Sequence, residues 1–451
     1  MKPNIFLLII DSFRSDKFYQ KNLSSKTTNI SKLVHNGSYF SQTISSADAT
    51  ILSWSSIFTS KFPFKTGIRS ARFNKLNKDT LTCFDILKNF DYSFYGYLPK
   101  LSETVGLFPN FRNDDYLFDF YQGITNGLGD KIINLLESNK MKEPWFFISH
   151  AMDLHSPIQI SEKFDNDHYG DTYYDRKISE IDFWIGEIFK KIDLSNTLVI
   201  VTSDHGDYIK SIKKNNLLID FHSNAQTEMT VSKIAGKTPN FLKPMKDKMF
   251  VLREKYIQEK KLKTISKLDL KPHEKRSLMS GKADTEHFLF DEKIRVPLLF
   301  VGKKIPKDFL VHQQVCTVDI FPTIFDMLDI HTKIDFDGTS LNPLLEGQKI
   351  HEKPAYIESN PLVLTESNDV IGIRTSQYKY FRDKDDPKKR VHLFDLLKDP
   401  NEDDNIFRNA KIVSEMEGIL QAILKNNPID DSSNNEESKE IEEELRKLGY
   451  L

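Results

Sequence analysis

The sequence has few cysteines and no dominant charge. Two cysteines occur among 451 residues, Cys83 and Cys316, each in an apolar setting. This argues against a disulfide framework and predicts two small core residues. Acidic and basic residues nearly balance, at a formal net charge of −2. The balance gives no reason to expect a nucleic acid or an anionic membrane surface as the main partner.

Long hydrophobic runs are also absent. The N-terminal stretch KPNIFLLIID is much shorter than the roughly 20 residues of a membrane span, and it lacks a small-residue cleavage site. We therefore expect a buried strand there, no membrane span, and a soluble, cytoplasmic protein. The composition, 39% hydrophobic and 28% charged, is that of a globular enzyme, and the length predicts one large domain with a smaller one attached.

Short apolar runs alternate with helical patterns along the chain. Four runs bounded by polar turns are typical of strands buried on both faces, at residues 5–10, 145–149, 197–202 and 296–301. Between them, isoleucines recur at spacings of three and four within residues 174–192, which predicts an amphipathic helix. Alternating strands and helices predict an α/β doubly wound sheet, in which ligands lie beyond the carboxyl ends of the strands.

Composition shifts divide the chain into three parts. We expect a large α/β domain at residues 1–349, a small C-terminal α+β subdomain of short antiparallel strands at 350–429, and a polar tail with a short terminal helix at 430–451. Within the first part, residues 208–285 form a lysine-rich insertion with a helix at 249–263. This insertion is either a lid over the sheet edge or a solvated charged excursion.

Polar side chains follow three of the predicted strands. Asp11 ends the first, residues 150–155 end the second, and Asp204 with His205 ends the third. Asp11 alone is typical of a helix cap. Carboxylates beside an imidazole, however, are ligands for a divalent cation. His150 and Asp153 are alternative ligands for a second ion, but their spacing fits a two-metal site poorly and favours one metal.

Ordered motifs along the chain resemble those of the sulfatase family within the alkaline phosphatase superfamily. The matching segments are PNIFLLIIDSFRSD, LVHNGSYF, FTSKFPFKTG, HSP, TSDHGD, FDEKIRVPLLF, TVDIFPTIFDMLDI, DGTSLNPLLEG and FDLLKDPNEDDN. The resemblance spans nearly the whole chain except the insertion. It implies an alkaline-phosphatase-like mixed sheet and a sulfatase-like catalytic domain with a smaller antiparallel C-terminal subdomain.

The resemblance also implies site residues. It puts Asp11, Asp204 and His205 on a divalent metal, identifies His155 as the histidine that binds the substrate oxyanion, and places His287 near the active centre. Lys282 and Lys293 are weaker candidates for the family's active-site lysine. Ca²⁺, Mn²⁺, Zn²⁺ and Mg²⁺ all suit such ligands, and the imidazole favours a transition metal.

The cysteine that sulfatases oxidise to formylglycine is missing. Counting back from Thr66-Gly67 puts Thr50 at its position, with Leu52 in place of the motif's proline and Trp54 in place of its arginine. Ser12 stands where a second acidic ligand is usual, and FYGYLPKLS lacks the supporting Gly-Lys-Trp-His pattern. Other superfamily members use Thr or Ser here, so the resemblance implies Thr50 as nucleophile and fourth metal ligand; a plain helix N-cap is the alternative.

These residues together predict a metal-dependent hydrolase. Its expected substrate is a sulfate or phosphate ester of a small molecule or glycan, attacked by Thr50, with His155 and His287 acting on the equatorial oxygens or the leaving alkoxide. A formylglycine hydrate can expel sulfate by collapsing to an aldehyde, but a threonine cannot. The threonine therefore favours phosphate and phosphonate esters as substrates over sulfate esters, without excluding sulfate. The alternatives are a phosphodiesterase, a phosphoethanolamine- or glycerophosphate-type transferase, or an inactive anion-binding homologue. The oligomeric state cannot be inferred from these residues.

Overall fold

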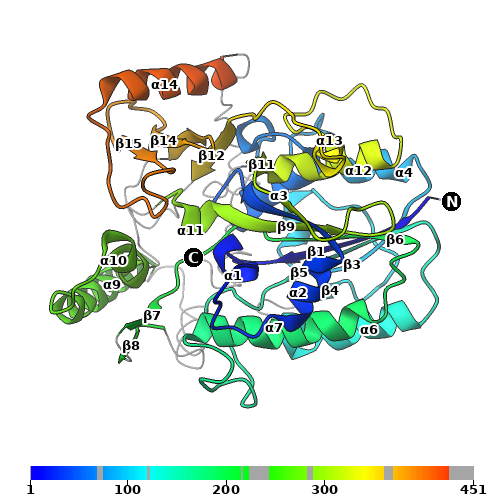
Figure 1. Ribbon diagram of the computed structural model, residues 1–451, viewed down its shortest axis with the longest axis horizontal. Helices are drawn as coiled ribbons and strands as arrows, with labels where there is room; N and C mark the ends of the chain where they lie inside the picture. Colours follow the sequence, from blue (N-terminus) through cyan, green and yellow to red (C-terminus); the bar gives the residue numbers. More distant parts are fainter. Residues whose placement is uncertain are drawn as a thin grey trace.

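A nine-stranded mixed sheet forms the centre of the molecule (Figure 1). The computed structural model describes residues 2–68, 75–118, 122–214, 217–222, 243–281, 288–359 and 369–425. The strand order is β10–β2–β9–β6–β1–β5–β3–β4, with β11 also pairing with β2. The strands are β1 (Asn4–Ile10), β2 (Gly37–Ile44), β3 (Ser93–Pro99), β4 (Leu117–Phe118), β5 (Trp145–Ala151), β6 (Thr197–Thr202), β9 (Arg295–Val301), β10 (Phe309–Val311) and β11 (Val315–Cys316).

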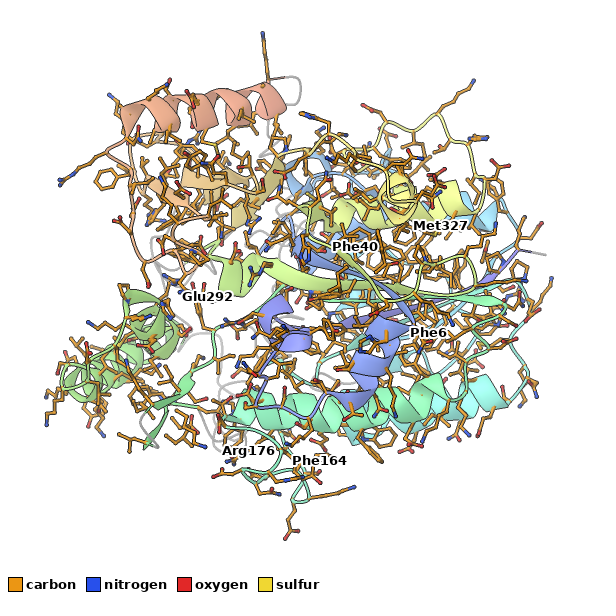
Figure 2. The ribbon with its side chains drawn as sticks, in the orientation of Figure 1. Phe6, Phe40, Phe164, Arg176, Glu292 and Met327 are labelled. Atoms are coloured by element: carbon orange, nitrogen blue, oxygen red, sulfur yellow. The ribbon has the colours of Figure 1, made fainter. Side chains whose placement is uncertain are left out.

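Helices cover both faces of this sheet (Figure 1). One face carries α3 (Thr50–Thr59), α4 (Cys83–Lys88), α12 (Ile320–Met327) and α13 (Asn342–Leu345), and the other carries α1 (Ser15–Phe18), α2 (Thr28–His35), α6 (Leu128–Glu137) and α7 (Tyr173–Phe189). Each face buries its own apolar cluster. Phe40 belongs to the first and Phe6 to the second, and Figure 2 labels them on opposite sides of the sheet. Short helical turns connect the elements at η1 (Pro63–Lys65), α5 (Ser102–Val105), η2 (Ile124–Asn126), α11 (Asp291–Ile294) and η4 (Thr317–Asp319).

A smaller antiparallel sheet follows near the C-terminus. Its order is β12 (Ala355–Ser359), β13 (Val370–Arg374), β14 (Tyr378–Asp383) and β15 (His392–Asp395), and α14 (Ala410–Leu424) packs against it. A buried ion pair fastens this sheet to the large one, because Arg374 of β13 donates two hydrogen bonds to Asp291 of α11, at 3.0 and 2.8 Å.

The described part of the lysine-rich insertion has a small core of its own. The hairpin β7 (Ser211–Lys214) and β8 (Leu217–Asp220) packs with α9 (Lys243–Ile265) and α10 (Pro272–Met279) through Ile219, Ile265, Leu270 and Leu278. His273 pairs with Asp403 at 2.8 Å, and Arg276 with Glu292, labelled in Figure 2, also at 2.8 Å. The insertion is therefore tied to α11 through Glu292 and to the segment after β15 through Asp403.

The expected fold class, an α/β fold with a mixed sheet and a smaller antiparallel C-terminal sheet, is confirmed. The strands predicted at 5–10, 145–149 and 197–202 are β1, β5 and β6, which pair in parallel. The run at 296–301 is β9, which is antiparallel to β2 and β6. The apolar run alone does not indicate this direction, because a strand buried on both faces can pair in either direction. The terminal helix expected within 430–451 lies outside the described residues. Among those residues, no helix is long and apolar enough to cross a membrane.

Candidate active site

Three adjacent strands deliver polar side chains to one edge of the large sheet. Because β1 pairs in parallel with both β5 and β6, the carboxyl ends of the three strands coincide. Asp11 follows β1 directly, and its backbone N–H donates to the carbonyl of Ala151 at 2.9 Å. His150 lies near the end of β5, and Asp204 with His205 closely follows β6.

Asp11, Asp204 and His205 form a cluster suited to a cation. Their ligand atoms lie within 4.8 Å of one another, and both carboxylates are fully buried. Nε2 of His205 is 3.9 Å from Asp11 and 3.7 Å from Asp204. The opposite ring nitrogen, Nδ1, donates to the carbonyl of Gly206 at 2.8 Å, so in the neutral ring Nε2, which faces the carboxylates, carries the lone pair. This is the usual arrangement of a metal-binding histidine.

The electrostatics of the cluster indicate missing positive charge. Burial alone would raise the pKa of Asp204, but His205 and the hydrogen bond from His150 outweigh it and hold that pKa well below its usual range. Burial lowers the pKa of His205, yet Asp204 and Asp11 raise it overall. Among the described residues, no lysine or arginine forms an ion pair with Asp11 or Asp204. Two buried carboxylates need such compensation, so a divalent cation fits this donor set.

Thr50 is the hydroxyl that faces the cluster. Its Oγ1 lies 3.4 Å from Asp11 Oδ2 and 3.2 Å from His205 Nε2. The other hydroxyls of α3 turn away, because they donate to main-chain carbonyl groups: Ser53 to Ala47, Ser55 and Ser56 to Leu52, and Thr59 to Ser55. Within this helix, Thr50 is therefore the residue whose hydroxyl faces the cluster.

The start of α3 also suits an anion. Thr50 is the first residue of the helix, and Ala49 at the N-cap supplies no side-chain hydrogen bond to its first turn. The first N–H groups of a helix lack intrahelical partners and carry partial positive charge. An ester anion at Thr50 would meet these donors. Sequence reasoning identified the hydroxyl but not this property of the helix.

The two motif departures at positions 12 and 54 have clear structural consequences. Ser12 adopts a left-handed backbone (φ 62°), and its hydroxyl donates to Asp11 Oδ1 at 2.5 Å. This hydrogen bond orients the Asp11 carboxylate. Trp54 is completely buried, and its ring meets the His150 ring edge-to-face at 4.8 Å between centroids. No guanidinium can act there.

Of the remaining predicted site residues, some are described by the structure and others are not. His155 lies in the turn after β5, half-buried, with Nδ1 donating to the carbonyl of Ser156 at 2.8 Å. His287 and Lys282 lie outside the described residues. Lys293 Nζ approaches Asp48, two residues before Thr50, at 3.8 Å, and its charge also lowers the pKa of Asp207, which burial would raise. Lys293 therefore lies close to the cluster.

Asp153 is occupied in a structural role. Its carboxylate accepts the backbone N–H groups of Ile124 and Thr125 at 2.8 and 3.1 Å and lies 3.6 Å from Lys177. His150, in contrast, contacts the cluster: its Nε2 is 3.2 Å from Asp204 Oδ2. The only sequence signal for His150 is its place at the end of a buried strand.

Comparisons with known proteins agree with this architecture. The family model described as Sulfatase matches residues 3–330, and the C-terminal model of N-sulphoglucosamine sulphohydrolase matches residues 283–428. Mouse (Mus musculus) arylsulfatase K is 32% identical over 124 residues, which span 26% of this chain but only 22% of that protein. The chain thus spans about a fifth of the length of this relative.

Solved structures match over nearly the full length at low identity. One protein, solved in complex with its substrate D-glucosamine-2-N,6-O-disulfate, has a TM-score of 0.65 at 16% identity. The match covers 96% of this chain and 100% of that protein's chain. The phosphonate monoester hydrolase of Agrobacterium radiobacter has a TM-score of 0.62 at 15% identity, covering 94% and 95%. At these identities the likeness concerns the fold.

Proposed function

Because the chain belongs to the sulfatase family, we propose that it is a hydrolase that cleaves a sulfate or phosphate ester by nucleophilic attack from Thr50. One observation carries the proposal: of the hydroxyls of α3, that of Thr50 faces two buried carboxylates and an imidazole, whereas the others donate to carbonyl groups of the backbone. A helix cap would not need those neighbours.

Asp11, Thr50, Asp204 and His205 are the residues that would hold a divalent metal. When bound, the cation supplies positive charge that lowers the pKa of a neighbouring hydroxyl and offsets the charge of an ester anion. The two carboxylates and one hydroxyl are hard oxygen donors, and the imidazole shifts preference from Ca²⁺ towards Mn²⁺ or Zn²⁺. Ser12 keeps Asp11 oriented through its 2.5 Å hydrogen bond.

The reaction then has two steps. Thr50 loses its proton to water, its Oγ1 bonds to sulfur or phosphorus, and the bond from that atom to the ester oxygen breaks. The departing alkoxide takes a proton from His155 and leaves as the alcohol. Water then attacks the sulfuryl- or phosphoryl-threonine and releases a proton that restores His155. Thr50 leaves, regains its proton from solvent, and inorganic sulfate or phosphate is released. The N–H groups that begin α3 bind the equatorial oxygens.

A threonine nucleophile can attack either of two classes of substrate, sulfate esters or phosphate and phosphonate esters. Family membership and a relative that acts on a glucosamine disulfate favour sulfate esters of glycans. A threonine in place of the formylglycine precursor, and a structural neighbour that hydrolyses phosphonate monoesters, favour phosphate or phosphonate esters. The second candidate function is therefore a phosphodiesterase or a transferase that passes a phosphoryl-linked group to an acceptor alcohol.

A panel of nitrophenyl esters tests the proposal. Purified full-length protein, loaded with Mn²⁺, Zn²⁺, Ca²⁺ or Mg²⁺ in turn, is assayed with the sulfate, phosphate monoester, phosphodiester and phenylphosphonate. We expect nitrophenol release from one ester class, loss of release after chelation, and recovery with one of the ions. Release only when an acceptor alcohol is added would favour the transferase. Protein that neither contains nor takes up a divalent ion would be an inactive homologue.

A further inference from the structure

His150 is a buried histidine that the proposed reaction does not use. It is completely buried near the end of β5, and its Nε2 lies 3.2 Å from Asp204 Oδ2 and 3.8 Å from Asp11 Oδ2. It thus contacts both carboxylates proposed to hold the metal. Its register explains this position, because His150 lies beside Ile9 of the central strand, two residues before Asp11.

The two histidines near the cluster differ in their second ring nitrogen. In His205, Nδ1 donates to the Gly206 carbonyl, which leaves a lone pair on Nε2 for a metal. In His150, Nδ1 is buried and has no hydrogen-bond partner among the described residues. If Nε2 of His150 bound a metal, Nδ1 would carry a proton with no acceptor, which is rare for a buried N–H. The favourable tautomer has its proton on Nε2, directed at Asp204.

An aromatic contact holds the His150 ring in this orientation. Trp54 meets it edge-to-face, at 4.8 Å between centroids and 89° between planes. Trp54 follows Thr50 by four residues in α3, so the two side chains share one face of the helix. The helix face that carries Thr50 therefore also carries Trp54, which packs against the His150 ring.

We propose that His150 is a positioning residue: its Nε2–H donates to Asp204 Oδ2 and fixes that carboxylate for metal binding, while Trp54 orients the ring. The proposal rests on the proposed function, since it takes Asp204 as a metal ligand. It also gives position 54 a role in this chain, in which a tryptophan replaces the motif's arginine. Hydrogen-bonded partners of metal ligands commonly tune affinity in this way.

Two substitutions separate this role from simple packing. His150→Gln can still donate from its amide nitrogen at nearly the place of Nε2, whereas His150→Leu fills the space without a donor. We expect His150→Leu to weaken Mn²⁺ or Zn²⁺ binding by about 10–100-fold, measured by calorimetry, and His150→Gln to recover most of that loss. Ser149→Ala, at the adjacent buried position of β5, is the matched control and should bind as the wild type does.

X-ray absorption of the zinc-loaded wild type provides a readout that needs no variant. We expect one imidazole per zinc, from His205. Two imidazoles would make His150 a ligand and overturn the proposal, as would equal affinities of the Leu variant and the wild type, or equal losses in the Leu and Gln variants. If the wild type binds no divalent ion, the proposed function fails as well; the other adverse outcomes leave it intact.

Discussion

Replacement of Thr50 by alanine tests the nucleophile directly. Among the residues that the structure describes, the Thr50 hydroxyl makes two long contacts, at 3.4 Å to Asp11 and 3.2 Å to His205, so its loss should change the free energy of unfolding by about 1 kcal/mol or less. In a chain of this size that corresponds to a shift in Tm of at most about 2–4 °C. The folded population at room temperature should therefore not change measurably.

Activity should respond very differently. Without Oγ1 no covalent intermediate can form, and we expect kcat/KM on the best nitrophenyl ester to fall by at least about 10⁴-fold, which corresponds to about 5 kcal/mol of transition-state stabilisation. Thr50→Ser keeps the hydroxyl and should retain most activity. Mass spectrometry of acid-quenched wild-type enzyme should show one added sulfuryl or phosphoryl group on the peptide that contains Thr50, and none in Thr50→Ala.

The matched control lies in the same helix. Ser56 is also buried, and its hydroxyl donates to the Leu52 carbonyl at 3.2 Å instead of facing the cluster. Ser56→Ala should lose a similar amount of stability and keep wild-type kcat/KM. If Thr50→Ala turns over the ester within about tenfold of Ser56→Ala, a difference worth only about 1.4 kcal/mol, the assignment of Thr50 as nucleophile is wrong.

Three further predictions concern the metal, a buried acid and the junction between the sheets. Adding the preferred ion at 100 times its Kd should stabilise the protein by about 2.7 kcal/mol, seen as a rise in Tm that EDTA abolishes; an unchanged Tm would contradict the metal site. Burial raises the pKa of Asp319 to about 6 despite N–H groups from Thr339 and Cys316, so its folded form keeps a proton that the unfolded form loses near pH 4. The stability that this group contributes is present below pH 4, and about 3 kcal/mol of it is lost as the pH rises through 6. Urea denaturation at several pH values should show this loss in the wild type and not in Asp319→Asn. The same loss in both proteins would refute the raised pKa. Arg374→Met should cost about 1.5–3 kcal/mol in the same assay, because it removes two charge-assisted hydrogen bonds from the buried Asp291 carboxylate, which keeps its ion pair with Lys379. Exposed Lys398→Met should cost under about 0.5 kcal/mol, and equal costs would refute the role of Arg374.

Local patterns in the sequence were sufficient for the central strands and for the candidate metal ligands. Apolar runs identified β1, β5 and β6, and the polar residues directly after them included Asp11, Asp204 and His205, which the structure brings within 4.8 Å of one another. This succeeds because a strand buried on both faces has a readable apolar signature, and because parallel neighbours must end at the same edge.

Other features depended on pairing and packing that no local pattern encodes. The direction of β9 was not readable, since its side chains are buried in either orientation. The small core of the insertion joins residues separated by more than 40 positions, from Ile219 to Leu278. His150 offered only a strand-end imidazole; its donation to Asp204 follows from the parallel pairing of β5 with β1.

The sequence by itself determined the fold class through its apolar periodicity, and its ordered motifs determined the resemblance to the family. That resemblance, counted back from Thr66-Gly67, made Thr50 the candidate nucleophile. Only the tertiary structure decided which hydroxyls of α3 are satisfied by the backbone and which one faces the carboxylates. The physical reason is that chemical type and spacing are properties of the chain, whereas the partner that satisfies a buried polar group is set by the whole packed fold.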